Sequence, residues 1–222
     1  MSYRLKLLLF VLCALAVLFG LNTAYSALNT LSRLDVVEAQ RDEWQRPVDV
    51  LQALSVQPGD AVADVGCGSG YFSLKLSRAA GKNGRVYAED IRTLPLVFLW
   101  FRKIQKSAGN ITLVRGNPLD PHLPMTLSAV LIANTYHELA DSQAMLARVR
   151  QSLLSGGRLV VVDRAPDPGG AQGRTFAEHE ISAERVESEL HRANFEIVTR
   201  QDRFIEKDPD NESWWMIVAR KP

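Results

Sequence analysis

The sequence predicts an α/β fold built on a mostly parallel sheet and preceded by a hydrophobic helix. Two observations carry this prediction. From residue 61 onward, short apolar runs alternate with longer segments of helical periodicity, the pattern of successive strand–helix units. The run at 62–65 leads into a turn with three glycines, and the run at 129–133 is apolar throughout, as in a strand that is covered on both faces.

The N-terminal segment, residues 1–28, is predicted to be a signal peptide or a membrane anchor helix. Arg4 and Lys6 precede an uncharged run from Leu7 to Leu21, and Ala-Tyr-Ser at 24–26 fits a small-x-small cleavage site. The run is short for a membrane span of about 20 residues. If it extends through Tyr25 and Ala27, however, it could serve as an uncleaved anchor. A buried core helix is the alternative, and it has no obvious place in the domain that follows.

Residues 29–57 are predicted to form an amphipathic helical lead-in to that domain. Pro47 is expected to divide this segment into two helices. Trp44 fits a core residue better than a lid over a site. The turn sequence Gln-Pro-Gly-Asp at 57–60 then ends the segment, so the domain proper is placed at 58–222.

The first strand and the turn after it carry the strongest functional signal. Asp64 lies in the strand, and Gly66, Gly68 and Gly70 form the turn before a helix that starts at about Tyr71. A dinucleotide fingerprint would have its third glycine where Tyr71 stands, and a carboxylate at Asp64 would repel a pyrophosphate. The carboxylate suits a ligand with an amine and a cation, as in S-adenosylmethionine (SAM).

The acidic residue followed by G-x-G-x-G resembles the first motif of the class I SAM-dependent methyltransferases. The segment LLSGGRLVVVD at 153–163 is similar to a further segment of that family. The resemblance covers about residues 47–220 and is closest to the small-molecule members of the ubiquinone/menaquinone-biosynthesis type. It implies a Rossmann-like, doubly wound sheet of seven strands, the class I methyltransferase fold, and SAM as the cofactor.

The resemblance also implies roles for the residues around the cofactor. Gly66, Gly68 and Gly70 would let the backbone approach SAM, and Asp64 would contact its amino group. Asp90, at the end of the strand expected at 85–91, would bind the ribose hydroxyls, with Glu89 as the reserve.

The third strand is expected at 111–115, where the family commonly has an aspartate after the following glycine. Asn117 stands in that place, and its carbonyl could accept a hydrogen bond from the adenine amino group. Asp120 is the fallback for this role.

The helix that begins at Thr93 is predicted to pack one apolar face on the sheet. A spacing of about 100° per residue groups the apolar side chains on that face and the cations opposite. The predicted inner face holds Leu96, Val97, Trp100, Phe101, Ile104 and Ala108, and the outer face holds Arg102, Lys103 and Lys106. The alternative is a helix that touches a bilayer.

Polar residues follow the apolar strand at 129–133 and mark the expected acceptor side. Asn134, Tyr136 and His137 come directly after its carboxyl end, where open α/β sheets bind ligands. In the family this segment faces the methyl group. His137 is predicted to take a proton from the acceptor, Tyr136 to orient the acceptor or form a wall of its pocket, and Asn134 to line the crevice.

The remaining segments complete the predicted sheet. Asp141 is expected to cap a helix that runs to Leu154 and stops at Ser-Gly-Gly 155–157, followed by a strand at 158–163. The loop at 164–181 contains His179, which fits either a substrate contact or a solvated charge cluster. Ser182 is expected to cap a further helix to Ala193, and strands are expected at 195–204 and 214–220.

The composition of this 222-residue chain limits the classes of partner that we expect it to bind. The net charge of +1 gives no reason to expect nucleic acid. The two cysteines, Cys13 and Cys67, offer neither a disulfide framework nor metal-ligand spacing, and no metal is expected. The predicted function is SAM-dependent methyl transfer to a small, hydrophobic or membrane-derived acceptor. The alternative is a non-catalytic, membrane-associated protein that binds SAM or a nucleotide cofactor.

The signals for membrane topology disagree. Arg4 and Lys6 favour a cytoplasmic N-terminus, which would send the domain outward, whereas SAM is made and used in the cytosol. Arg33 and Arg41 on the other flank weaken that bias. We therefore expect an uncleaved, membrane-bound form with the domain on the cytoplasmic side. Cleavage before Ala27 would instead give an exported protein.

Overall fold

The computed structural model describes residues 3–166 and 179–222. The chain divides into two compact units, Met1–Arg41 and Asp42–Pro222. The larger unit contains all the strands and, with them, the candidate site.

The first unit consists of most of helix α1 (Tyr3–Trp44), which runs without a break through the boundary expected at 28/29. No helix within the described ranges is long and apolar enough to cross a membrane, so the transmembrane helix expected from the sequence is not found.

The break at Pro47 is confirmed. Helix α1 ends at Trp44, and the short helix α2 (Pro47–Leu54) begins at the proline, whose missing N–H needs no partner at a helix start. Trp44 packs against Trp214 with ring centroids 5.8 Å apart, which supports its reading as a core residue.

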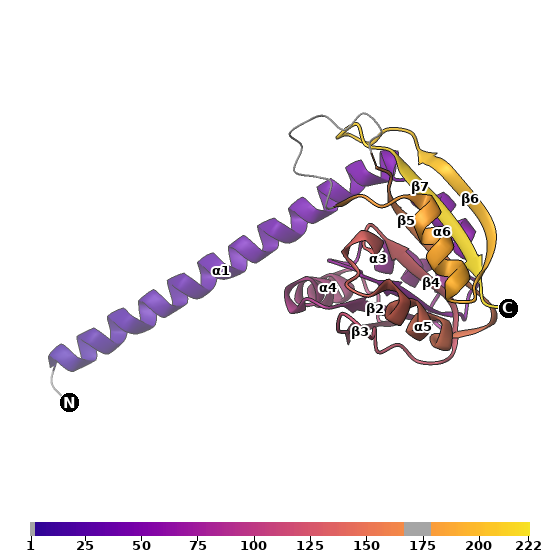
Figure 1. Ribbon diagram of the computed structural model, residues 1–222. Helices are drawn as coiled ribbons and strands as arrows, with labels where there is room; N and C mark the ends of the chain where they lie inside the picture. The colour runs from indigo at the N-terminus through magenta and orange to yellow at the C-terminus, as the bar shows by residue number, and fades with distance from the viewer. Residues whose placement is uncertain (1–2, 167–178) are drawn as a thin grey trace. The chain divides into compact units, whose positions relative to one another are not determined.

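The larger unit is organised around one seven-stranded sheet in the order β3-β2-β1-β4-β5-β7-β6 (Figure 1). The five strands from β1 to β5 are parallel, and β7 is antiparallel to both of its neighbours. The expected mostly parallel, doubly wound sheet is therefore confirmed. The strands are β1 (Ala61–Val65), β2 (Arg85–Asp90), β3 (Ile111–Arg115), β4 (Leu127–Ala133), β5 (Leu153–Arg164), β6 (Glu196–Ile205) and β7 (Trp214–Arg220).

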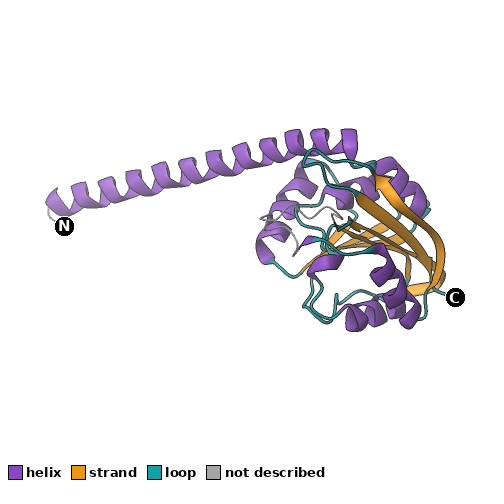
Figure 2. Cartoon of the chain, turned by 45° about the horizontal axis from the view of Figure 1, so that its top comes forward, coloured by secondary structure: helices purple, strands orange, loops and turns teal. Residues whose placement is uncertain are grey.

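Helices cover both faces of the sheet (Figure 2). Side chains of α2, α3 (Tyr71–Ala80) and α4 (Thr93–Gln105) pack on one face, and those of α5 (Ser142–Ser152) and α6 (Ala183–Arg192) pack on the other. The sequence of β5 is apolar without alternation because both faces of this strand are buried. Val160 and Val162 enter the first core cluster, whereas Leu159 and Val161 enter the second.

Both predicted side-chain caps are present. The Asp141 carboxylate accepts a hydrogen bond from the backbone N–H of Ala144, and the Ser182 hydroxyl accepts one from Arg185. The predicted end of α5 is wrong, because the helix stops at Ser152 and β5 begins at once. The stretch expected to end the helix instead pairs with the backbone of Lys221 through both Gly156 and Gly157.

The predicted inner face of α4 is right only in part: Leu96 and Ala108 are buried, but Val97, Trp100, Phe101 and Ile104 are exposed. Leu99 and Arg102, which the sequence did not place on that face, are buried as well. Two contacts with the glycine turn orient the helix. The Arg102 guanidinium donates a 2.7 Å hydrogen bond to the Ser69 carbonyl, and Leu99 lies where a side chain at Gly70 would be. A polar anchor thus overrides the hydrophobic periodicity.

Candidate active site

Five parallel strands end at one edge of the sheet: β1 at Val65, β2 at Asp90, β3 at Arg115, β4 at Ala133 and β5 at Arg164. The strand order reverses between β1 and β4, since β2 and β3 follow on one side and β5 on the other. Open α/β sheets bind ligands outside such a switch point. The glycine turn after β1 and the polar residues after β4 flank this point.

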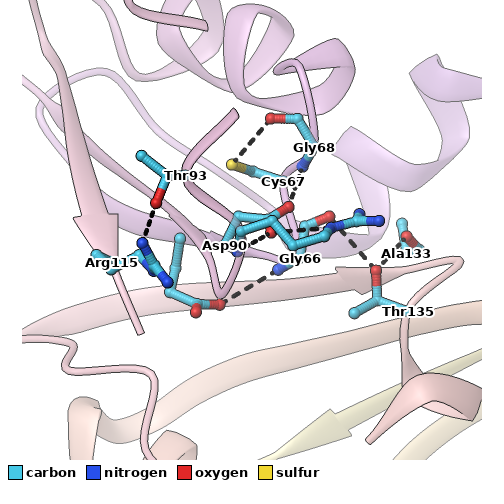
Figure 3. Close-up of polar contacts among 10 residues, drawn as sticks. Gly66, Cys67, Gly68, Asp90, Thr93, Arg115, Ala133 and Thr135 are labelled. Carbon is cyan, nitrogen blue, oxygen red and sulfur yellow. Dashed lines mark hydrogen bonds and ion pairs between the residues drawn. The ribbon is translucent and has the colours of Figure 1, made fainter. Parts of the chain in front are cut away.

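The three glycines of the turn serve three different purposes. All have positive φ, which L side chains rarely adopt. At Gly66 a side chain would collide with Thr135, whose hydroxyl lies 3.4 Å from the Gly66 carbonyl oxygen (Figure 3). At Gly70 it would collide with Leu99. Only at Gly68 would an added Cβ meet none of the described atoms within 4 Å, so the turn is open to a ligand there.

Two adjacent carboxylates at the end of β2 hold the turn. Asp90 accepts a 3.0 Å hydrogen bond from the backbone N–H of Gly68 and a 2.8 Å bond from that of Arg92 (Figure 3). Glu89 accepts a 3.3 Å bond from the N–H of Gly66. Both side chains are buried. Both acids thus lie beside the turn, and the predicted contact of Asp90 with a ribose stays a prediction.

The surroundings of Glu89 change its pKa. Burial raises the pKa of its carboxyl to about 7, the Gly66 N–H works against this rise, and the charges of Asp90 and Asp64 add to it. Its Oε1 lies against Gly116, where any side chain would collide with it. Among the described residues, that oxygen has no hydrogen-bond partner of ordinary geometry.

Asp64 and Cys67 lie deeper under the turn. The Asp64 carboxylate is buried and accepts a 2.6 Å hydrogen bond from the Ser73 hydroxyl on α3. Burial, with three neighbouring carboxylates, raises the pKa of the Cys67 thiol well above its usual range. The thiol therefore stays protonated, so Cys67 is a packing residue and not a nucleophile.

These groups fit SAM. The open backbone at Gly68 admits a ligand, and the buried carboxylates beside it can accept hydrogen bonds from hydroxyls or an amine. Asn134 adds a further acceptor at the end of β4. It has a positive φ of 54°, and its buried side-chain oxygen has no hydrogen-bond partner among the described residues.

Asn117 lies in the turn after β3, but its carbonyl is already engaged. It accepts hydrogen bonds from the N–H groups of Leu119 at 2.9 Å and Asp120 at 3.0 Å. Its amide nitrogen lies 3.1 Å from a ring nitrogen of His122. The residue thus shapes its own loop, and an adenine contact at this position stays a prediction.

On the acceptor side, His137 forms a pair with Asp163 at the end of β5. Its Nδ1 lies 2.8 Å from the Asp163 carboxylate, which also accepts a 3.1 Å bond from the His137 backbone N–H. Because a carboxylate only accepts, Nδ1 carries a proton, and in the neutral imidazole Nε2 is then the nitrogen with the free lone pair. The imidazole is 3% exposed and Asp163 is fully buried. The Nε2 atom faces Glu138 and His179.

Tyr136 begins the short 3₁₀ turn (Tyr136–Glu138) and belongs to the core cluster that α5 and α6 share with the sheet. The ring is buried in the core, and the hydroxyl donates a 2.7 Å hydrogen bond to Glu189 on α6. Burial and this carboxylate raise the pKa of the phenol. In this structure Tyr136 therefore joins α6 to the sheet, and a contact with the acceptor stays a prediction.

Sequence reasoning did not assign Asp163, Thr135 or Arg102 to the site. A signal existed for Asp163 alone, because it ends an apolar run whose strand lies beside β4, and an acid at the carboxyl end of a strand can reach the crevice. Thr135 and Arg102 act through contacts with the glycine turn, which no local pattern shows.

Comparison with known proteins agrees with the resemblance seen in the sequence. The model of the ubiE/COQ5 methyltransferase family matches residues 16–167. The demethylmenaquinone methyltransferase of Oceanobacillus iheyensis is 25% identical over 146 residues, which cover 65% of this chain and 58% of that protein. The chain thus spans little more than half the length of this curated relative.

Solved structures agree at the level of the fold. A SAM-dependent methyltransferase from Aquifex aeolicus superposes with a TM-score of 0.71 at 20% identity, over 85% of this chain and 97% of that one. Geranyl diphosphate methyltransferase in complex with SAM gives 0.66 at 17% identity, over 80% of this chain and 85% of that one. These likenesses confirm the expected methyltransferase fold.

Proposed function

Because the chain belongs to the ubiE/COQ5 methyltransferase family, we propose that it transfers a methyl group from SAM to a small acceptor of the quinone type. The observation that carries this proposal is the glycine turn, which is open at Gly68 and is held by buried Asp90 and Glu89 at the switch point of the sheet. The acceptor class is supported by the name of the curated relative, a demethylmenaquinone methyltransferase.

When bound, SAM supplies a methyl group carried on a sulfonium, which loses its charge as the methyl leaves. The protein's part is to position the reactants and exclude water. Asp90 would accept hydrogen bonds from the ribose hydroxyls, with Glu89 beside it, and the backbone at Gly68 would let the ligand approach. Asp64 would supply the negative charge that attracts the amino group.

The acceptor lies beyond the end of β4. Asp163 fixes the His137 ring through Nδ1, so Nε2 is the nitrogen that takes the proton that an acceptor hydroxyl loses. Asn134, also at the end of β4, adds a buried carbonyl oxygen that has no partner among the described residues. Buried Asp163 stabilises the imidazolium that forms.

Cofactor binding tests the first half of the proposal. We expect calorimetry to show binding of SAM and none of NAD. Asp90→Ala should weaken SAM binding on the order of tenfold or more, because charge-assisted hydrogen bonds to the ribose are lost. Asp202→Ala, an exposed acid on β6, is the matched control and should bind SAM normally. A chain that binds NAD and ignores SAM would overturn the proposal.

Turnover tests the second half, with labelled SAM and a demethylated quinol as the acceptor. His137→Ala should lower turnover by about 10²–10⁴-fold, the usual contribution of a positioned acid–base group, while SAM affinity stays near that of the wild type. His191→Ala, on α6, should leave both unchanged. Full activity in His137→Ala would show that the histidine is structural.

We also propose that the protein works at a membrane, with the domain on the side that contains SAM. Exposed apolar side chains on α1, such as Phe10, Leu18 and Phe19, and a hydrophobic acceptor support this location. Carbonate washing of membranes and sequencing of the mature N-terminus provide the test. A mature chain that begins at Ala27, with the domain accessible to protease from outside, would reverse this assignment.

A further inference from the structure

Three side chains with metal-ligand chemistry meet at the carboxyl end of β4. They are His137 and Glu138, on the 3₁₀ turn, and His179, which is distant in the sequence. One ligand atom of each lies within 4.8 Å of the others. His137 Nε2 is 3.8 Å from the Glu138 carboxylate, and the two imidazole rings stand edge to face with centroids 5.5 Å apart.

The hydrogen bond of His137 to Asp163 is the kind that metal-binding histidines make. Its Nδ1 donates to the fully buried carboxylate of Asp163, and this leaves a lone pair on Nε2, the atom that faces the other two groups. Histidines that bind metals almost always donate their second ring nitrogen to such a carboxylate or carbonyl, which fixes the tautomer and raises the basicity of the ligating atom. The cluster therefore has both its ligands and an outer-shell partner.

We propose that His137, Glu138 and His179 bind a divalent transition metal ion of the zinc class. Two imidazoles and one carboxylate form the three-ligand set of open zinc sites, in which a fourth position stays free. Ligand atoms about 2.0–2.2 Å from one zinc ion lie roughly 3.4 Å apart. The cluster thus has to contract slightly, and the Glu138 side chain, which is 51% exposed, has room to rotate.

The free position takes an oxygen of the methyl acceptor, and this part of the inference rests on the proposed function. A bound divalent ion lowers the pKa of a coordinated hydroxyl, whose proton then passes to solvent. With the ion present, Nε2 of His137 is a ligand, and the ion takes over the task that the free imidazole would otherwise perform. The acceptor class that this favours is a phenol or quinol with an oxygen next to the methylated atom.

Binding of the metal alone is the direct test. Tag-free, full-length protein is stripped of metal and titrated with Zn²⁺ by calorimetry and with Co²⁺ by absorption spectroscopy. We expect one ion per chain and a tetrahedral Co²⁺ spectrum. His179→Ala and Glu138→Gln should each lower Zn²⁺ affinity at least tenfold, and Asp163→Asn should lower it about 10–100-fold, as loss of an outer-shell partner does.

The chain offers a matched control among its four histidines. His191→Ala removes an imidazole from α6, outside the cluster, and should leave Zn²⁺ binding unchanged. Thermal unfolding of each variant shows whether it is folded. Should Asp163→Asn unfold, His179→Ala and Glu138→Gln still decide the question, because both remove side chains at the surface end of the site.

Two results would overturn the site: a wild-type chain that binds no Zn²⁺, or binding that survives unchanged in both His179→Ala and Glu138→Gln. The same samples are tested for SAM binding and methyl transfer. Zinc binding without methyl transfer would support the metal site and contradict the proposed function. Methyl transfer that is unchanged between stripped and zinc-loaded protein would remove the metal's role in acceptor binding.

Discussion

Because the Glu89 carboxyl is buried, it should make the free energy of unfolding of the domain depend on pH. Its oxygens lie between the N–H of Gly66 and the backbone at Gly116, and burial raises its pKa from an ordinary value of 4.5 to about 7. In this range the folded chain holds a proton that the unfolded chain releases. The free energy of unfolding is therefore highest below about pH 4.5, as far as this group is concerned, and falls as the pH rises through 7.

Glu89→Gln is expected to remove this dependence. The amide keeps an oxygen for the Gly66 N–H and never ionises, so the variant should be more stable than the wild type at pH 8 by on the order of 1–3 kcal/mol, and nearly equal at pH 5. Urea unfolding at both pH values measures the difference. Glu196→Gln, an exposed carboxylate on β6, is the control. An unchanged pH profile in Glu89→Gln would contradict the assignment.

At the scale of elements, α4 is held by one buried cation. Arg102→Met removes the hydrogen bond to Ser69 while keeping most of the packing, and should lower the free energy of unfolding by about 1–3 kcal/mol, because the Ser69 carbonyl loses its charged donor. SAM affinity should fall with it, since the turn is then held less firmly. Urea unfolding and calorimetry provide the two measurements.

Ile104→Gln on the same helix is the matched test of orientation. Ile104 is 58% exposed, so this change should stay within about 0.5 kcal/mol of the wild type. Had the apolar periodicity determined the inner face, the same substitution would bury an amide in the core and destabilise by several times as much. A large fall in the free energy of unfolding in Ile104→Gln would therefore indicate that the inner face is the one predicted from the sequence.

Elements with local signals could be predicted, and contacts between distant segments could not. The strand at Ala61–Val65, the helix after the glycine turn and the caps Asp141 and Ser182 lie where sequence patterns placed them, because these patterns act within a few residues. The rotation of α4 depends on Ser69, which is distant in the sequence. Likewise, the His137–Asp163 pair arises only when β4 and β5 lie side by side.

At the scale of the whole molecule, the core and the candidate site lie in the unit Asp42–Pro222. We expect a chain that starts at Glu38 to fold by itself, with SAM affinity and urea midpoint close to those of the full-length protein. The added residues keep a helical turn ahead of Asp42, which accepts hydrogen bonds from Tyr71 and Lys75 on α3. A start at Pro47 removes this anchor and should be less stable. Equal stability of the two truncations would contradict the role of Asp42.

The position of β7 has a consequence for how the protein is made. This strand follows β6 in the chain but lies between β5 and β6 in the sheet. During translation β6 therefore leaves the ribosome before its sheet neighbour exists, and the free edge of β5 stays unpaired for the same interval. Unpaired strand edges are templates for association between chains. Until Trp214–Arg220 emerges, each nascent chain carries two such edges, so early pairing of β7 with both strands protects the chain from association with others.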